Sequence, residues 1–178
     1  WSESGDVVYN TDGLSIAEGA SLTIGSGRKI KLSSGANIAV YGTLKATGAA
    51  FTSSDGETKW GGIGFLNSGS SDSILENCTI EHAGNFWNNY GAIFCSQSSP
   101  VIKNCTINGS SNYGIYVNSG AFPSVSNNKI TGHTYGIYID NVSGGTYQGN
   151  IFSNNVYGIE INGSGGTYQN NIFSKNDY

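Results

Sequence analysis

Apolar and polar residues alternate over short segments of this chain. The clearest examples are Ile115-Tyr116-Val117, Ile137-Tyr138-Ile139 and Ile159-Glu160-Ile161. A period of two places the outer residues of each triplet on one face and the middle residue on the other, which predicts β-strands. Asn, Gly and Ser separate these segments, and no window has the helical period. The pattern therefore predicts an all-β chain of short strands and tight turns.

The predicted strands recur at a fixed interval. The motif Tyr-Gly-Ile occurs three times, with Gly114, Gly136 and Gly158 spaced 22 residues apart, and a fourth copy begins at Tyr90. A second motif places Asn just before an inward Ile, in Asn77-Cys78-Thr79-Ile80, Asn104-Cys105-Thr106-Ile107, Asn128-Lys129-Ile130, Asn150-Ile151 and Asn171-Ile172. Self-similarity with a period in the twenties is typical of solenoid proteins.

A period this short leaves no room for a packed helix in each repeat, and the leucine-rich consensus is missing. We therefore expect coils of short strands that hydrogen-bond in parallel at about 4.8 Å, with like residues lying on like residues. The prediction is one domain over residues 1–178, a single-stranded parallel β-helix of roughly eight coils. Residues 1–59 form its opening coils, and residues 60–178 carry the Asn and Gly-Ile repeats.

The repeats resemble the right-handed parallel β-helix of the pectin-lyase-like superfamily, whose loose repeat reads Asn-x-Ile, then Asn, then Gly-Ile. Residues 150–159 are a close example. Front segments look like the opening coils of secreted bacterial and archaeal β-helix surface proteins, in Leu22-Thr23-Ile24, Ile30-Lys31-Leu32, Ile38-Ala39-Val40, Gly42-Thr43-Leu44 and Trp60-Gly61-Gly62-Ile63. The resemblance covers nearly the whole chain and implies the fold. It does not decide function, because the superfamily holds lyases, hydrolases, epimerases, adhesins and structural proteins.

Composition narrows the function classes. A net charge of −4 with a single Arg argues against nucleic-acid binding. No stretch approaches the 18 or so apolar residues of a membrane span. The chain begins at Trp1, which suggests a processed secreted protein or a piece of a longer one. Abundant Ser, Thr, Asn, Gly and Tyr are typical of extracellular proteins, so we expect an extracellular or cell-surface location.

Catalytic residues are not evident. The resemblance implies a basic residue beside a carboxylate in lyases, or paired Asp residues on consecutive coils in hydrolases. The only Arg, Arg28, lies in the opening coils, and the slots next to Asp140 and Glu160 hold Asn and Tyr. The least implausible constellation is Glu76, Glu81 and His82. We expect no cofactor and no metal, and we interpret His82 and His133 as solvated turn residues.

Aromatic residues are the stronger candidates for binding. We assign the outward middle slot of successive strands to four of them: Phe65, Phe94, Tyr116 and Tyr138. An exposed aromatic stripe could stack on sugar rings or bury against another protein. The alternative is a ladder that only stabilises its own sheet.

The segment 84–89 breaks the repeat and contains Phe86 and Trp87. These two large side chains make the segment the best single candidate for a partner or ligand contact. The alternative is that the segment folds back as a lid over the sheet.

The cysteines occupy core slots in this scheme. Cys78 and Cys105 take the same slot in successive repeats, and Cys95 takes the slot of Val117. Buried, inert thiols are the favoured interpretation. A Cys78–Cys105 disulfide is the alternative, because stacked positions are close enough in Cα distance.

Five Asn residues begin an Asn-x-Ser/Thr sequence. We expect Asn77 and Asn104 to stack inside the coil. Asn108, Asn141 and Asn162 lie at predicted loop positions and are the better glycosylation acceptors.

These observations favour a non-catalytic extracellular β-helix that acts as a structural or adhesive element. We expect copies of the chain to associate into a filament, sheath or surface layer. The alternative is a module that binds or modifies glycans through the aromatic stripe and the segment with Phe86 and Trp87.

Overall fold

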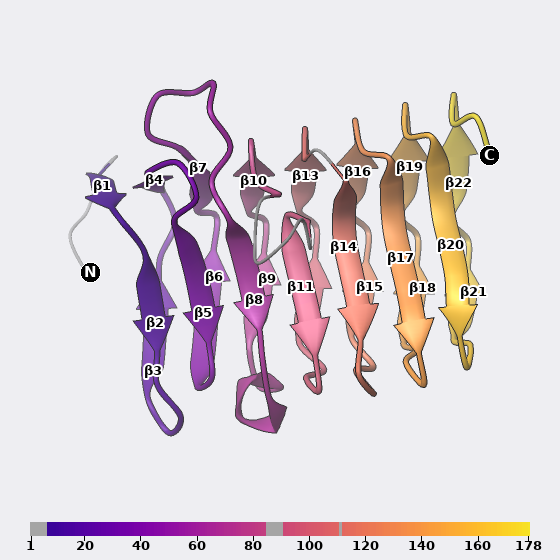
Figure 1. The fold of residues 1–178 in the computed structure, drawn as a ribbon, viewed down its shortest axis with the longest axis horizontal. Helices are drawn as coiled ribbons and strands as arrows, with labels where there is room; N and C mark the ends of the chain where they lie inside the picture. The colour runs from indigo at the N-terminus through magenta and orange to yellow at the C-terminus, as the bar shows by residue number, and fades with distance from the viewer. Residues whose placement is uncertain (1–6, 85–90, 111) are drawn as a thin grey trace.

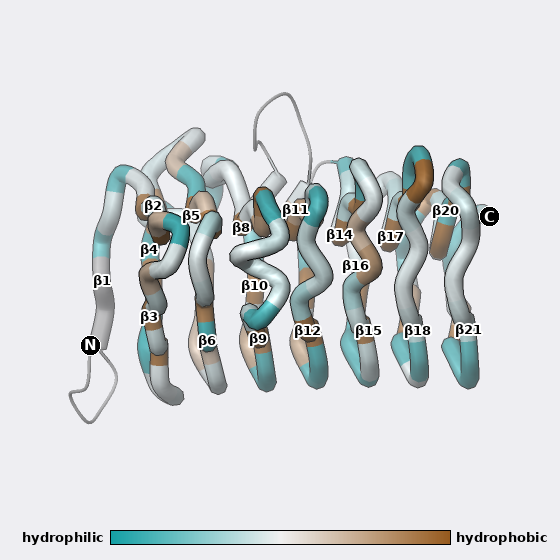
Figure 2. The backbone as a smooth tube through the Cα atoms, turned by 90° about the horizontal axis from the view of Figure 1, so that it is seen from below, coloured by the Kyte–Doolittle hydropathy of each residue, from teal (hydrophilic) through white to brown (hydrophobic). Residues whose placement is uncertain are grey.

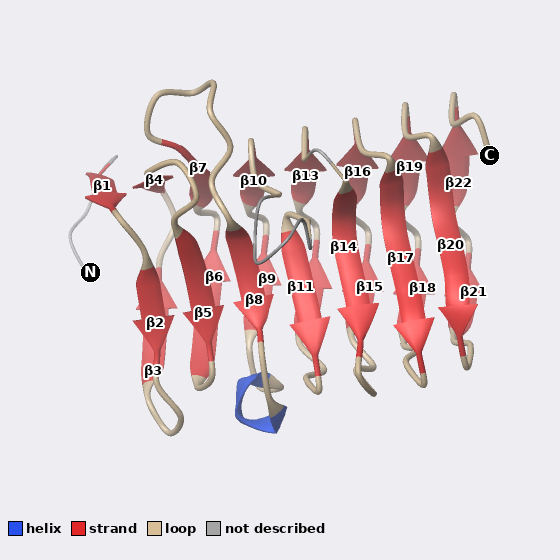
Figure 3. Ribbon diagram, in the orientation of Figure 1, coloured by secondary structure: helices blue, strands red, loops and turns tan. Residues whose placement is uncertain are grey.

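The chain winds as a parallel β-solenoid in the computed structural model, which describes residues 7–84, 91–110 and 112–178. Three parallel sheets run along the rod, and each strand pairs with strands three places away in the sequence (Figure 1). Helix is confined, among the described residues, to the short turn η1 (Ser68–Ser70) (Figure 3). The predicted fold class is confirmed. The strands make seven turns preceded by β1, which is close to the roughly eight coils expected.

Each sheet collects one strand from every turn. Sheet A contains β1 (Val7–Thr11), β4 (Arg28–Leu32), β7 (Ala50–Ser53), β10 (Thr79–Glu81), β13 (Thr106–Asn108), β16 (Lys129–Thr131), β19 (Ile151–Ser153) and β22 (Ile172–Ser174). Sheet B contains β2 (Leu14–Ile16), β5 (Asn37–Val40), β8 (Gly62–Phe65), β11 (Ile93–Ser96), β14 (Tyr113–Asn118), β17 (Tyr135–Asn141) and β20 (Tyr157–Gly163). Sheet C contains β3 (Ser21–Ile24), β6 (Thr43–Thr47), β9 (Ile74–Glu76), β12 (Val101–Lys103), β15 (Ser124–Ser126), β18 (Thr146–Gln148) and β21 (Thr167–Gln169).

The core consists of columns of like side chains along the axis. In sheet B, Ile63, Ile93, Ile115 and Ile137 lie side by side in successive strands, and all four are fully buried. The apolar positions recur from coil to coil along the tube (Figure 2). Because a shift of one residue would turn every inward side chain outward, these columns hold neighbouring coils in register.

The turn from sheet C to sheet A requires one residue in the left-handed region. Asn supplies it at Asn77, Asn104, Asn127 and Asn170, with φ between 53° and 55°. Asn is one of the few non-glycine residues that adopt this conformation readily. The side chains of Asn77 and Asn104 are exposed there, so the expectation that they stack inside the coil is wrong.

The residue that follows points inward and forms a ladder of hydrogen bonds. The Oδ1 atom of Asn128 accepts from the N–H of Cys105 at 2.8 Å, and its Nδ2 donates to the carbonyl of Ile102 at 2.9 Å. Asn150 repeats both bonds one coil later, with the N–H of Asn128 and the carbonyl of Val125, each at 2.9 Å. Each Asn therefore satisfies one buried donor and one buried acceptor of the preceding coil.

Two cysteines take the place of Asn in earlier coils of this column. The Sγ atoms of Cys78 and Cys105 lie 3.4 Å and 3.5 Å from the carbonyls of Ala46 and Leu75, the acceptors that an Asn amide would reach. Cys78, Cys95 and Cys105 are all free and buried thiols. The alternative Cys78–Cys105 disulfide is thus not formed in this structure, where the thiols face main-chain carbonyls.

A second inward column lies in the turn from sheet A to sheet B, and His133 belongs to it. His133 is 3% exposed, so its interpretation as a solvated turn residue is wrong. Its Nδ1 accepts from the N–H of Ser110 at 3.2 Å, and its Nε2 lies 3.1 Å from the carbonyl of Ile107. Asn155 makes the equivalent bonds one coil later, with the N–H of His133 at 3.0 Å and the carbonyl of Ile130 at 3.1 Å. The neutral imidazole thus makes the same two hydrogen bonds as an Asn amide, with Nδ1 as the acceptor and Nε2 as the donor.

We predict that Asn150→Ala destabilises the solenoid. The substitution leaves the N–H of Asn128 and the carbonyl of Val125 buried without partners. An unsatisfied buried group costs about 1–3 kcal/mol, so we expect a loss on the order of 3 kcal/mol in the free energy of unfolding, measured by urea titration. Gln148→Ala, at an exposed position of β18, is the control and should change that free energy by less than about 0.5 kcal/mol. Equal effects of the two substitutions would contradict the ladder.

We also predict that His133 makes stability depend on pH. Burial lowers the pKa of His133 from 6.5 to about 4. The unfolded chain binds a proton first as the pH falls, so the stabilisation is complete above pH 6.5 and is lost as the pH falls towards 4. That loss amounts to about 3 kcal/mol at most.

His133→Asn should keep both hydrogen bonds of the column and remove this contribution. Urea titrations of both proteins at several pH values between 7 and 4 measure the difference, because the other titrating groups are common to both. An unchanged pH dependence in the variant would show that His133 is not the responsible group.

Candidate functional site

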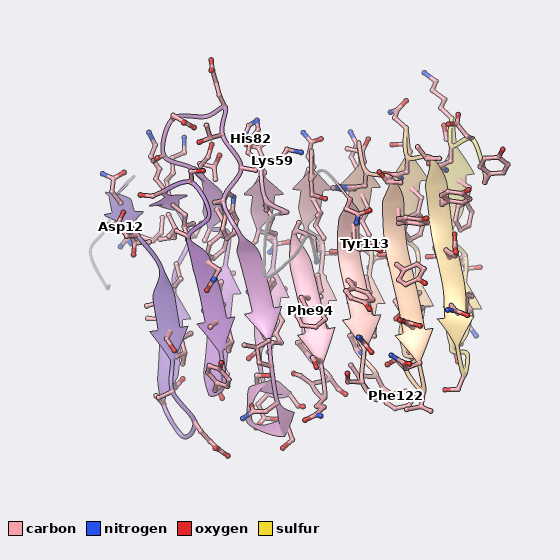
Figure 4. The ribbon with its side chains drawn as sticks, viewed as in Figure 1. Asp12, Lys59, His82, Phe94, Tyr113 and Phe122 are labelled. Atoms are coloured by element: carbon pink, nitrogen blue, oxygen red, sulfur yellow. The ribbon has the colours of Figure 1, made fainter. Side chains whose placement is uncertain are left out.

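The outer face of sheet B carries a cluster of aromatic rings. We call it the aromatic surface, and it consists of Phe94, Tyr113, Tyr116, Tyr135, Tyr138, Tyr157 and Tyr178. Figure 4 shows Phe94 and Tyr113 on the face of the front sheet. The rings come from β11, β14, β17 and β20 and from the end of the chain. The register brings residues that are distant in sequence into one surface.

The tyrosines that open β14, β17 and β20 form one stacked column with Tyr178. Ring centroids lie 5.2 Å apart between Tyr113 and Tyr135, 4.9 Å between Tyr135 and Tyr157, and 5.0 Å between Tyr157 and Tyr178. Their planes differ by 11° to 26°, so each ring covers the face of the next. What remains for a ligand is a row of ring edges and phenol hydroxyls at the spacing of the coils.

The predicted aromatic stripe forms the second column, with one correction. Phe94, Tyr116 and Tyr138 are neighbours, with centroids 5.3 Å and 5.6 Å apart. Phe65 does not join them, because the register places it beside Cys95 and it is fully buried in the core. Gly64 holds the outward slot in its place.

The exposed character of the stripe is also wrong for two of its members. Phe94 and Tyr116 are each only 7% exposed, because neighbouring rings of the same surface cover them. Tyr138 is half-buried.

The tyrosines of the first column were missed as site residues. Their signal was the Tyr-Gly-Ile repeat itself, which was used only to establish the period. The side chains of Tyr113, Tyr135 and Tyr157 are half-buried at the start of each strand. They therefore contribute as much to the outer face as the middle slots do.

Polar side chains border the aromatic surface at the far end of the strands. The Asp140 carboxylate accepts from the hydroxyl of Tyr116 at 3.3 Å and from Nδ2 of Asn162 at 3.3 Å. Asn118 donates to the hydroxyl of Tyr116 at 3.0 Å. Glu160 lies beside Tyr138 and occupies the middle slot of β20. The border thus offers both carboxylate acceptors and amide donors.

The phenols of Tyr113 and Tyr135 are neutral hydrogen-bonding groups. Burial raises the pKa of Tyr113 and of Tyr135 above the ordinary value of 10. Both hydroxyls therefore remain protonated at neutral pH and can donate as well as accept.

The constellation named from the sequence is not brought together. Glu76 lies in sheet C and pairs with Lys103 at 3.1 Å, whereas Glu81 ends β10 in sheet A. His82 lies 3.4 Å from the hydroxyl of Thr52. Among the described residues, no group of three or more His, Cys, Asp or Glu side chains could hold a metal ion.

A Ser–His pair was missed by the sequence analysis but is not placed for nucleophilic attack. Oγ of Ser110 lies 2.5 Å from Nδ1 of His133. The same hydroxyl donates to the carbonyl of Tyr113 at 2.6 Å, and both members of the pair are 3% exposed. The sequence signal for the buried position of His133 was its spacing from Asn155, because the two residues lie one 22-residue period apart. The pair is part of the ladder.

Phe86 and Trp87 lie outside the described residues, so their assignment as a contact site stays a prediction. The glycosylation assignments stay predictions as well. Asn108 and Asn141 are exposed, but the Ser residues of their sequons, Ser110 and Ser143, are buried. In the sequon of Asn162, the Asn and the Ser are both exposed.

Comparison with known proteins identifies a family. A family model described as "Right handed beta helix region" matches residues 6–139 and 47–178, which together span nearly the whole chain. Searches of curated proteins and of solved structures found no match. Within the described residues, no helix has the length and apolar character needed to cross a membrane.

Proposed function

The chain belongs to the right-handed β-helix family, and from that premise we propose that it is a non-catalytic, extracellular, adhesive β-helix that binds neutral glycan chains. The binding site in this proposal is the aromatic surface of sheet B with its polar border. The observation that carries the proposal is the regular row of tyrosines, stacked coil upon coil, with carboxylate and amide groups beside it.

Hydrogen bonding is the main contribution in this proposal. The stacked rings cover one another, so a sugar meets their edges and hydroxyls. Phenol hydroxyls donate and accept, amides donate, and carboxylates accept strongly, which together suit the hydroxyl groups of a sugar. Because the coils repeat at about 4.8 Å, successive tyrosines can engage successive parts of an extended polymer.

The charge of the surface supports a neutral ligand. Asp140 and Glu160 lie at its border, and β14, β17 and β20 contain no Lys or Arg. A carboxylated or sulfated sugar would meet like charges there, whereas a neutral sugar would meet acceptors.

Removing hydroxyls while keeping the rings tests this proposal. The double variant Tyr135→Phe with Tyr157→Phe should weaken binding of neutral oligosaccharides by about ten-fold or more, since each hydrogen bond contributes roughly 1 kcal/mol. Tyr41→Phe makes the same change at a tyrosine that is not part of the aromatic surface and should leave affinity unchanged. Isothermal titration with cello-, manno- and chito-hexaose measures the effect. Absence of binding by the unsubstituted protein at millimolar ligand, or equal loss in the control, would exclude this role.

Self-association is a second proposal, supported by a separate observation. Two apolar side chains in neighbouring outward positions of sheet A are exposed: Ile151 of β19 at 40% and Ile172 of β22 at 57%. An exposed apolar cluster of this kind favours contact with another apolar surface. In this proposal, copies of the chain associate through that cluster.

Ile151→Glu should then reduce the assembly of the chain in sedimentation velocity experiments at increasing concentration. Phe122→Glu is the control, because Phe122 is another large exposed apolar side chain, at 54%, and lies beside a different turn (Figure 4). A single monomeric species at every concentration, or an equal effect of both variants, would contradict self-association through this cluster.

A further inference from the structure

A groove runs along β7 on the outer face of sheet A, away from the aromatic surface. Two adjoining cavities of about 320 Å³ and 280 Å³ make up this groove, and Lys29 and Ala50 line both. Arg28, Asn77 and Thr79 line the first cavity, and Lys31, Thr52, Glu81 and His82 line the second. The groove therefore spans β4, β7 and β10.

Side-chain size along neighbouring strands creates this groove. The register sets Lys29 beside Ala50 and Lys31 beside Thr52, and Thr79 lies on the other side of Ala50. The outward positions of β7 are therefore small, while those of β4 are long. Two lysines form one wall above a floor of Ala50 and Thr52.

The first cavity is cationic. Arg28 and Lys29 line it, and no acidic residue does. Arg28 is buried and shares the inward side of β4 with Ile30 and Leu32, so Lys29 supplies the outward charge. Lys29 is exposed and Lys31 is half-buried, and neither forms an ion pair among the described residues, where the single pair is Lys103 with Glu76. These ammonium groups are therefore available to a ligand.

Asp55 and Glu81 line the second cavity, but the Asp55 carboxylate is already hydrogen-bonded within its own loop. The Asp55 carboxylate accepts from the main-chain N–H groups of Glu57 and Thr58 at 2.9 Å each and from the hydroxyl of Thr58 at 2.5 Å. Those bonds hold the pKa of Asp55 far below its ordinary value. Glu81 remains at the wall formed by β10, opposite Lys31.

The spacing of the cations indicates the shape of a ligand. Lys29 and Lys31 are two residues apart on one strand, which places their Cα atoms about 6.6 Å apart on the same face. Side chains at alternate positions of an extended peptide have the same period. β7 is four residues long, so the groove can hold a comparable length of extended chain.

We propose that this groove binds an extended acidic peptide segment with carboxylates at alternate positions. One carboxylate lies in the first cavity against Lys29, and the next lies against Lys31. Glu81 accepts hydrogen bonds from hydroxyl or amide groups farther along the peptide. The site is separate from the aromatic surface, and it does not depend on the proposed glycan binding.

Peptides that differ only in the spacing and charge of their acids test this proposal. The probe is Ac-Ser-Thr-Asp-Thr-Asp-Thr-Ser-amide; one comparison peptide carries the two Asp residues adjacent to each other, and another carries Asn in place of Asp. In fluorescence anisotropy at low salt, the alternating peptide should bind about ten-fold more tightly than the adjacent one, and the Asn peptide should not bind. Equal affinity for the two acidic peptides would overturn the proposed fit to the strand period.

Charge-removing variants identify the groove. The double variant Lys29→Gln with Lys31→Gln should lose about ten-fold or more in affinity for the alternating peptide. Lys129→Gln is the matched control, because Lys129 is exposed in the same outward position of β16, outside the groove. Equal losses in the two variants would show non-specific attraction and overturn the site.

Two further measurements distinguish peptide binding in the groove from glycan binding at the aromatic surface and from binding of an acidic glycan in the groove. The Tyr135→Phe and Tyr157→Phe double variant should bind the peptide unchanged, so a failure of glycan binding leaves this result intact. Tighter binding of an oligogalacturonate than of the peptide, lost in the lysine double variant, would overturn the assignment of a peptide as the occupant.

Discussion

The structure depends on satisfying buried main-chain groups inside the turns between sheets. A solenoid of short strands turns several times in each coil, and the backbone groups inside those turns cannot reach water. In the turn from sheet C to sheet A, Asn128 and Asn150 each accept one N–H and donate to one carbonyl of the coil before. A side chain that can do both occupies this position in three successive coils, at Asn128, Asn150 and Asn171.

Chemical substitutes also occur in these columns, and they keep one or both of the hydrogen bonds. The thiols of Cys78 and Cys105 reach the carbonyls that an amide would reach, and His133 supplies one acceptor and one donor in its neutral form. The thiol is a weaker donor than an amide, and the imidazole can take up a proton. Variation along the ladders thus changes local stability and pH response while the coil path stays the same.

The same register determines what the outer faces can do. Stacking of like residues places tyrosine rings face to face in sheet B, so that surface presents edges and hydroxyls. In sheet A, neighbouring strands carry outward residues of different size. The small Ala50 beside the long Lys29 leaves a groove there. Stacked like residues thus form a continuous surface, whereas a small residue beside a large one leaves a pocket.

Most of the fold could be predicted from the sequence, because the period and the strand alternation are both visible in Tyr-Gly-Ile and Asn-x-Ile. Phe65 was placed on the wrong face because Gly64, and not an aromatic residue, follows Ile63 in the outward slot; pairing of Ile63 with Ile93 puts Phe65 beside Cys95 on the inward side. His133 was misread because residue type suggested a solvated turn, although its spacing from Asn155 matched the ladder. The groove could not be predicted, since it depends on side chains of three strands brought together by the register.

A double-mutant cycle between Asn128 and Asn150 tests the ladder most directly. The two side chains are in contact through Nδ2 of Asn128 and Oδ1 of Asn150 at 3.0 Å, although they are 22 residues apart in sequence. The account predicts that the two Ala substitutions are not additive, with a coupling free energy on the order of 1 kcal/mol in urea unfolding. Additive effects within about 0.3 kcal/mol would contradict the claim that successive coils are joined through this column.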